Sequence, residues 1–165
     1  MKKTIAFIVL VLIVVNAFVL YYFDLSTTGR SIFGGWNYER ENVFVGKVID
    51  GDTVIINGES VRLLGIDTPE RGEPCYKEAK KHLEEIVLNK MVTVERGRED
   101  RDRYKRLLRY IFIETNDGEL AVNLKMISDG FAIARFYDDV PYKKEYVAAE
   151  QYARENNIGC KWQMN

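Results

Sequence analysis

The stretch VRLLGIDTPERGE, residues 61–73, begins as an apolar strand and ends in a dense cluster of charge. It places Arg62, Asp67 and Glu70 around Thr68. Carboxylate and carbonyl oxygens are the ligands that suit Ca²⁺, and a planar guanidinium is well shaped for a phosphate. A charged loop that simply leaves a strand fits the same residue types equally well. A metal and phosphate site and a solvated loop are therefore the two open hypotheses.

A second acidic turn, D-G-D-T, contains Asp52 and joins two predicted strands. Asp and Gly favour turns for local reasons, so a purely structural role is the simpler interpretation of this motif. The following Asn57-Gly58 pair predicts a tight hairpin that places Asp52 opposite Leu63. Asp67 then lies four residues farther along the chain, roughly 13 Å along a straight strand. Only a sharply coiled strand would bring the two carboxylates together.

The remaining charged residues limit which side chains could form a catalytic or binding site. Arg62 interrupts the apolar strand SVRLL, either as an arginine that snorkels at a sheet edge or as a phosphate clamp. The arginine-rich segment 96–110 is interpreted as a solvated loop whose charges pair with one another. His82 is the only histidine and is expected at the surface of a helix. Histidine-based nucleophilic and metal sites are thereby excluded, which leaves carboxylates and arginines as the convergent groups.

The overall charge of the protein is not positive enough to attract nucleic acid to the surface as a whole. The 165 residues suit one domain and carry a formal net charge of −1. Residues 1–40 hold four basic and two acidic residues, so they contribute +2 and leave −3 for residues 41–165. A protein that neutralises the phosphates of long nucleic acids is normally basic. Any phosphate chemistry must therefore come from a local site.

The N-terminus reads MKKTIAFIVLVLIVVNAFVLYYF and has the length and composition of a membrane-spanning helix. We expect residues 1–23 to be an uncleaved anchor, with a removed secretory signal as the alternative. Cleavage after Ala17 would leave an apolar new terminus, which favours the anchor. Lys2 and Lys3 favour a cytoplasmic N-terminus, which would place the following domain outside the cytoplasm.

The two cysteines, Cys75 and Cys160, form no C-x-x-C pair, so a zinc site is not expected. In an exported domain a disulfide between them is plausible, and it would join the start of the first helix of the domain to the end of the last. Two unpaired thiols are an equally open alternative.

Hydrophobic periodicity predicts the elements that must position these residues. Strands are predicted at 43–49, 53–56, 60–64, 91–95 and 107–113, an extended segment at 131–136, and helices at 76–88, 121–128 and 142–156. One helix lies between the third and fourth strands, and two follow the fifth. This order favours an α+β, mainly β fold, in which helices pack against a small closed or partly open barrel.

Four motifs occur in an order and spacing that resemble the thermonuclease (staphylococcal nuclease-like) family. They are IDGDT (49–53), VRLLGIDTPE (61–70), DRYKR (102–106) and NLKMISDGFA (123–132). The resemblance covers about residues 42–162, after a linker at 24–41. It implies a five-stranded OB-fold barrel with three helices. It also implies Ca²⁺-dependent hydrolysis of DNA and RNA that leaves 3′-phosphate ends.

The resemblance also implies roles for individual residues. It assigns Asp52, Asp67 and the carbonyl of Thr68 to Ca²⁺, Glu70 to the general base, Arg62 and Arg106 to phosphate binding, and Tyr104 and Tyr137 to the substrate. Because the barrel of this family bends strongly between the two aspartates, the straight-strand estimate is overruled. Arg71 and Glu73 are then interpreted as ordinary loop charges.

Two positions depart from the family pattern. Lys105 replaces a glycine that is common between the tyrosine and the arginine of the DRYKR motif. Phe136 and Tyr137 stand where the family has a pair of base-stacking tyrosines. The resemblance therefore predicts the metal-binding and catalytic residues more fully than the residues that bind the substrate.

A catalytically silent OB-fold module that binds single-stranded nucleic acid outside the cell is the alternative function. Such a module would need aromatic residues and a basic groove rather than a matched set of acids. The acidic balance of the domain and the intact acid set both favour the nuclease. We expect a monomeric catalytic domain held outside the cytoplasm by the N-terminal helix.

Overall fold

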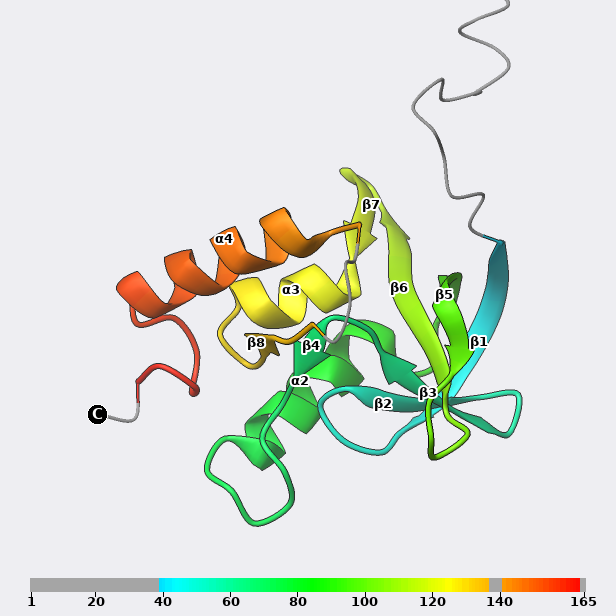
Figure 1. Cartoon of the computed structure of the whole chain (residues 1–165), viewed down its shortest axis with the longest axis horizontal. Helices are drawn as coiled ribbons and strands as arrows, with labels where there is room; N and C mark the ends of the chain where they lie inside the picture. The colour runs from blue at the N-terminus through cyan, green and yellow to red at the C-terminus, as the bar shows by residue number, and fades with distance from the viewer. Residues whose placement is uncertain (1–38, 137–140, 164–165) are drawn as a thin grey trace, which may run out of the picture. The chain divides into compact units, whose positions relative to one another are not determined.

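The computed structural model describes residues 39–136 and 141–163. Five of its strands form a barrel (Figure 1): Arg40–Val48 (β1), Thr53–Ile56 (β2), Glu59–Leu63 (β3), Met91–Arg101 (β5) and Leu107–Thr115 (β6). Their order is β3-β2-β1-β5-β6, with antiparallel pairing between neighbours. A parallel pairing of β3 with β6 closes the barrel. This confirms the predicted five-stranded barrel.

The hairpin between β2 and β3 follows directly from its sequence. Asn57 and Gly58 both have positive φ, 52° and 82°, as a two-residue turn of this hand requires. The resulting register pairs Thr53 with Arg62. Leu63 therefore lies opposite Asp52, and its N–H donates to the Asp52 carbonyl at 2.8 Å. The predicted hairpin and its register are both confirmed.

Branched apolar side chains fill the barrel. Val45, Val54 and Ile111 are fully buried, and the alternation of buried and exposed residues along β1 is the pattern of a strand with one face toward a core. Burial of each such side chain stabilises the fold by about 1.5–3 kcal/mol. The same core continues under the helices, so barrel and helices pack as one unit.

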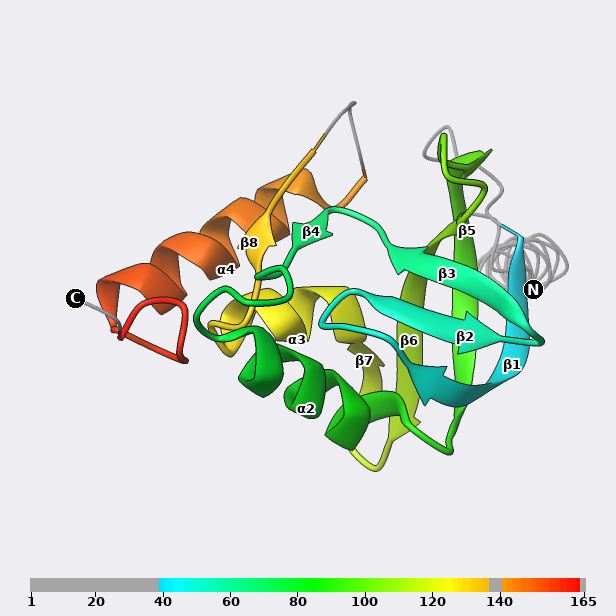
Figure 2. The ribbon, with the colours of Figure 1, turned by 90° about the horizontal axis from the view of Figure 1, so that it is seen from below.

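Three helices accompany the barrel: Tyr76–Val87 (α2), Val122–Ser128 (α3) and Lys143–Glu155 (α4). α3 lies between α2 and α4 in both views (Figures 1 and 2). α2 buries Ala79, Leu83, Ile86 and Val87, whose spacing defines one apolar face of a helix. Packing of this face against the core fixes the segment that leads into α2.

Short strands outside the barrel complete the fold. Ile66–Asp67 (β4) pairs antiparallel with Ile133–Ala134 (β8), and Gly118–Ala121 (β7) forms a hairpin with β6. The β4–β8 pair brings the segment after β3 next to the segment before α4. Arg135 donates its backbone N–H to the Gly65 carbonyl at 2.9 Å, which extends this contact by one residue.

The structure differs from the predicted elements at three places. Residues 96–101, interpreted as part of a solvated loop, continue β5. β7 was not predicted as a strand, and only Ile133–Ala134 of the extended segment 131–136 is paired. The self-pairing of this arginine-rich region is confirmed, since Arg96 and Arg109 both pair with Asp100.

His82 was predicted to lie at the surface of a helix, but the structure shows it packed against a neighbouring segment. Its Nε2 lies 2.7 Å from the Asp129 Oδ2, and its ring stacks on Phe131 with 4.2 Å between the ring centroids. The side chain is half-buried between α2 and the turn after α3. The prediction was wrong because it considered only the helix that carries His82 and not the loop packed against it.

Cys75 and Cys160 form a disulfide. Of the two open alternatives for the cysteines, the structure therefore shows the bonded one. Cys75 immediately precedes α2, and Cys160 follows α4. The bond thus ties the loop after β4 to the C-terminal segment.

The predicted membrane segment, residues 1–23, lies outside the described residues. In the part of the chain that the structure describes, no helix is long and apolar enough to cross a membrane. β1 begins at Arg40, two residues before the expected start of the domain.

Candidate active site

Asp52 is a buried acid in the turn between β1 and β2, with 3% of its surface exposed. Its Oδ2 accepts the backbone N–H of Thr68 at 3.1 Å and the Thr68 hydroxyl at 2.9 Å. Its Oδ1 accepts the Thr53 hydroxyl at 3.1 Å. A Cβ on Gly51 would come within 2.8 Å of the Thr68 Oγ1, so glycine is required for this close approach. These bonds compensate for the burial of the carboxylate and fix its orientation.

A sharp change of direction after β3 brings Asp67 toward Asp52. Gly65 has φ +76°, a conformation that glycine adopts without steric cost. The Arg62 Nη2 donates to the Ile66 carbonyl at 3.1 Å and holds the chain after the turn. The straight-strand separation of roughly 13 Å does not apply, because β3 ends at Leu63 before this turn.

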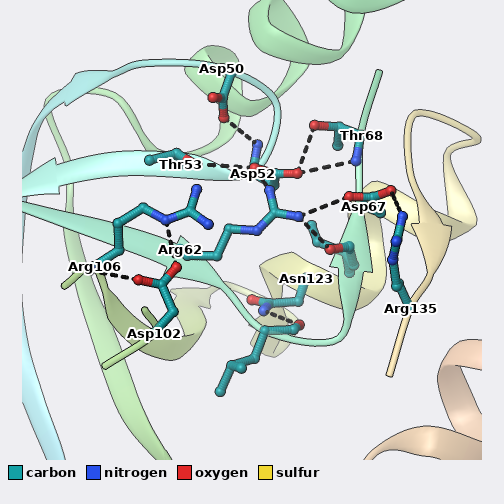
Figure 3. Close-up of polar contacts among 12 residues, drawn as sticks. Asp50, Asp52, Thr53, Arg62, Asp67, Thr68, Asp102, Arg106, Asn123 and Arg135 are labelled. Carbon is teal, nitrogen blue, oxygen red and sulfur yellow. Dashed lines mark hydrogen bonds and ion pairs between the residues drawn. The ribbon is translucent and has the colours of Figure 1, made fainter. Parts of the chain in front are cut away.

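Arg62 lies between the two acids (Figure 3). Its guanidinium forms an ion pair with Asp52, and its Nη2 donates to the Asp67 Oδ1 at 3.0 Å. Burial lowers the pKa of Arg62; Asp67 opposes this shift, and the like charge of Arg106 adds to it. An arginine stays protonated at neutral pH even after such a shift. Both carboxylates therefore converge on one fixed positive charge.

Glu70 lies in the loop after β4, and its side chain is exposed. Its backbone N–H donates to the Glu73 Oε2 at 2.8 Å, and the Glu73 N–H donates to the Glu70 carbonyl at 2.9 Å. In the described part of the chain, the Glu70 carboxylate itself has no hydrogen bond or ion pair. The loop is held by its backbone, while the Glu70 carboxylate is left without a protein partner in the described part of the chain.

Arg106 is positioned by Asp102. The Asp102 Oδ2 accepts the Arg106 Nε at 2.7 Å, and its Oδ1 accepts the backbone N–H groups of Tyr104 and Arg106 at 2.9 Å each. Burial raises the pKa of Asp102, but the hydrogen bonds and charge of Arg106 outweigh it and lower the pKa overall. Lys105, between Tyr104 and Arg106 in the sequence, has a positive φ of +64°. One carboxylate thus shapes the loop and orients the arginine.

A single cavity of about 510 Å³ joins these groups. Its lining comprises five carboxylates, four cations and three further residues: Asp50, Asp52, Asp67, Glu70 and Glu73; Arg62, Arg106, Arg135 and Lys161; and Thr68, Pro69 and Ile133. The formal charges of this lining leave −1. The cavity has the size of a small-molecule site but an ionic lining, which suits a charged ligand rather than an apolar one.

Comparison with known proteins supports this interpretation. Residues 60–163 match the family described as staphylococcal nuclease homologue. The chain is 36% identical to a thermonuclease of Staphylococcus intermedius over 70% of this chain and 71% of that protein. The chain belongs to the staphylococcal nuclease family. It is also 28% identical to a thermonuclease of Staphylococcus hyicus, over 88% of this chain and 91% of that protein.

A further relative is the endonuclease YncB of Bacillus subtilis (strain 168). It is 34% identical over 71% of this chain and 60% of that protein. Together with the staphylococcal nuclease family match, these relatives support a nuclease.

Most residues that the family resemblance pointed to meet in the cavity. Asp52, Arg62, Asp67, Thr68, Glu70 and Arg106 all line it. Tyr104 does not: it is 65% exposed, its hydroxyl accepts the Arg103 Nη2 at 2.7 Å, and its ring lies 5.5 Å from the Arg106 guanidinium. Tyr137 lies outside the described residues.

Four charged residues of the cavity lining were not predicted as site residues, and Asp50 is one of them. Glu73, interpreted as an ordinary loop charge, lines the cavity and supports the Glu70 loop. Arg135 and Lys161 also line the cavity. No local pattern marks the two cations, because they reach the cavity only through the β4–β8 pairing and the disulfide. The Glu73 contact, in contrast, spans three residues and could have been anticipated as a turn.

The buried Asn123 has a supporting role that its motif alone did not reveal. Its Oδ1 accepts the Ile111 N–H at 2.9 Å, and its Nδ2 donates to the Leu64 carbonyl at 2.9 Å. It therefore ties α3 and β6 to the start of the turn that redirects the chain toward Asp67. The signal for this role was a polar residue at an apolar position of a predicted helix.

The donor chemistry of the site fits a hard divalent cation. Oxygens of Asp52 and Asp67 both approach the Arg62 guanidinium, so the two carboxylates already face one cationic group. Carboxylates are the ligands that Ca²⁺ prefers. Along the described residues, no three acidic, histidine or cysteine side chains form a ready metal cluster. A bound ion would therefore need the two aspartates together with backbone or solvent oxygens.

Proposed function

We propose that this nuclease hydrolyses phosphodiester bonds of DNA and RNA with Ca²⁺ and leaves 3′-phosphate ends. The observation that carries the proposal is the convergence of Asp52 and Asp67 on Arg62 in a cavity that also contains Glu70 and Arg106. Acids alone would suit only a cation, and arginines alone would suit only an anion. Their combination suits a cation-assisted reaction on a phosphate.

Asp52, Asp67 and the carbonyl of Thr68 would hold the ion. When bound, Ca²⁺ supplies electrostatic polarisation of a phosphoryl oxygen and offsets the net negative charge of the cavity. The hydrogen bonds from Thr68 and Thr53 keep Asp52 in place whether or not the ion is present. Binding of the ion would require Arg62 to release the oxygens of the two aspartates that it contacts in this structure.

Glu70 acts on the attacking water. Its unpaired carboxylate accepts the proton of the water as the water oxygen bonds to phosphorus. The bond to the 5′-oxygen breaks, and the departing 5′-oxygen takes a proton from solvent to give the 5′-hydroxyl. Arg62 and Arg106 donate hydrogen bonds to the phosphate, whose oxygens gain charge in the transition state. The fork of donors on a guanidinium suits this geometry better than the point charge of a lysine.

The proposal also covers how the chain contacts its substrate and where the domain lies relative to the membrane. Tyr104 and Tyr137 would contact the nucleotide that carries the reacting phosphate. Residues 1–23 would anchor a monomeric domain outside the cytoplasm, where Ca²⁺ is more abundant and the genome of the cell is protected. Protease treatment of intact cells should remove the domain, whereas full protection in intact but not lysed cells would contradict this location.

One experiment tests the proposed activity. The purified full-length chain is incubated with denatured DNA and with RNA, in Ca²⁺ or in chelator, and the end groups of the products are determined. Degradation that requires Ca²⁺ and yields 3′-phosphates supports the proposal. Retention of intact strands would instead support a silent nucleic-acid-binding module, and neither binding nor cleavage would reject both.

A further inference from the structure

Two cations line the cavity outside the proposed catalytic set. Arg135 follows β8, and Lys161 lies in the segment after α4. The Arg135 Nη1 donates to the Asp67 Oδ2 at 2.7 Å, so it contacts the same carboxylate as Arg62. Figure 3 shows Arg62 and Arg135 approaching Asp67 from opposite sides. Positive charge therefore continues past Asp67, away from the proposed reaction centre.

The exposure of the three arginines differs in a way that separates their roles. The Arg62 side chain is 16% exposed, Arg106 is 30% exposed and Arg135 is 51% exposed. Arg62 and Arg106 lie deep and are held by Asp52, Asp67 and Asp102. Arg135 is the most exposed of the three, so an incoming nucleic acid can reach its guanidinium.

Lys161 has a fixed backbone. Its N–H donates to the Gly130 carbonyl at 3.0 Å, and the preceding residue, Cys160, is bonded to Cys75. Its half-buried side chain has no ion pair with any described residue. A lysine held in this way in an acid-rich cavity is suited to an anion from outside the protein.

The charge of the cavity requires such groups if the ligand is a polyanion. Its five carboxylates repel a nucleic acid, and its two deep arginines are held by acids. Arg135 also pairs with Asp67, but its side chain is half exposed and can be reached from solvent. A bound divalent ion would act at one phosphate only. Phosphates on either side of that position need their own cations, because neutralisation of the backbone supplies most of the affinity for single strands.

We propose that Arg135 and Lys161 form a second phosphate-binding site, which takes the phosphodiester next to the scissile one on a single-stranded nucleic acid. The site favours polymers over isolated diesters without reading the bases. The inference deepens the proposed function and rests on it for the position of the scissile phosphate. It is chemically distinct from the reaction itself, because neither cation acts on the transferred proton.

Binding to intact DNA tests the inference without relying on catalysis. The full-length chain carrying Glu70→Gln is titrated, in Ca²⁺ and over a series of salt concentrations, with a fluorescent oligothymidylate of about twelve nucleotides. Arg135→Gln and Lys161→Gln are added separately to this background. Lys144→Gln is the matched control, because it removes one charge from the exposed start of α4, outside the cavity.

Each cavity variant should weaken binding by about fivefold, the scale of an exposed ion pair. Each should also lower the slope of log affinity against log salt by about 0.7, the value for one lost phosphate contact on a single strand. A dinucleotide with one phosphodiester, used as a competitor, should lose less affinity than the oligonucleotide. The control should match the Glu70→Gln parent in all three measurements.

Slopes for both cavity variants equal to that of Lys144→Gln would overturn the inference. Failure of the unsubstituted chain to degrade denatured DNA with Ca²⁺ would overturn the proposed function instead. The two failures are separate, because the salt slopes are measured on DNA that is not cleaved.

Discussion

The Glu73 carboxylate accepts the backbone N–H of Glu70 at 2.8 Å, and the Glu73 N–H donates to the Glu70 carbonyl at 2.9 Å. This reciprocal contact closes the loop that presents the proposed general base. The Glu70 side chain makes no polar contact with any described residue, so its position depends on this backbone arrangement. Glu73 therefore holds the backbone of the Glu70 loop and is not an ordinary loop charge.

Removal of the Glu73 carboxylate should reduce turnover through Glu70. We expect Glu73→Ala to lower kcat by about tenfold, less than loss of a general base, because only the alignment of Glu70 changes. Glu73→Gln keeps a side-chain oxygen as acceptor and should retain most of the activity. Steady-state hydrolysis of denatured DNA measures both variants. Equal losses in the two would show that the charge of Glu73, and not its hydrogen bond, matters.

The proposed catalytic roles predict larger effects. Glu70→Gln or Arg106→Ala should lower turnover by at least about 100-fold, the scale of a lost base or of a lost donor to the transition state. Arg98→Ala, at an exposed position of β5 outside the cavity, is the matched control and should keep normal activity. Circular dichroism should show that all three fold. Near-normal turnover of folded Glu70→Gln would contradict the assignment of the base.

The sequence predicted the barrel well because its signals are local. Asn57-Gly58 specifies the hairpin, and that hairpin determines the position of Asp52 opposite Leu63. The residue motifs also pointed to most of the cavity lining. Local patterns did not predict that Asp67 approaches Asp52. That approach needs the turn at Gly65, and it was predicted only from the family resemblance.

Contacts between distant segments account for the remaining errors. Arg135 reaches Asp67 through the β4–β8 pairing, across 68 positions of sequence. His82 contacts Asp129 across 47 positions, and its side chain is therefore half-buried. Periodicity describes one element at a time, so it does not report which side chain a second element will place beside it.

The pair of His82 and Asp129 predicts a dependence of stability on acid. Burial raises the pKa of Asp129, but hydrogen bonds from His82 and Lys125 outweigh it and lower the pKa overall. A carboxylate with a lowered pKa in the folded state stabilises the fold above its unfolded pKa, near 3.8, and loses this contribution as pH falls below that value.

Urea unfolding at neutral pH and near pH 3 measures this effect. The difference in the free energy of unfolding should be smaller in Asp129→Asn than in the unsubstituted chain, because the amide does not titrate. Asp117→Asn is the control, since Asp117 is exposed and its side chain has no ion pair among the described residues. The same acid sensitivity in Asp129→Asn and in the control would contradict the prediction.

Lys105 predicts a stabilising substitution. Its φ of +64° is a left-handed conformation that costs a non-glycine residue about 1–2 kcal/mol. Lys105→Gly removes this strain but adds freedom to the unfolded chain, so we expect the free energy of unfolding to rise by up to about 1 kcal/mol. Arg103→Gly, in the same loop and without a positive φ, should lower it. Destabilisation by both variants would show that the Lys105 side chain compensates for its backbone.

The disulfide predicts a dependence on redox conditions that links stability to the cavity. Cys75 and Cys160 are 85 residues apart, so their bond restricts a long loop of the unfolded chain. Reduction should lower the free energy of unfolding by about 2–5 kcal/mol. The bond also holds Lys161 against the segment that follows the Glu70 loop, so reduction should weaken binding of single-stranded DNA as well.

A chain carrying both Cys75→Ser and Cys160→Ser should show the lower stability and the weaker binding without reductant, and reductant should change neither further. An unsubstituted chain whose urea midpoint does not respond to reductant would contradict the prediction.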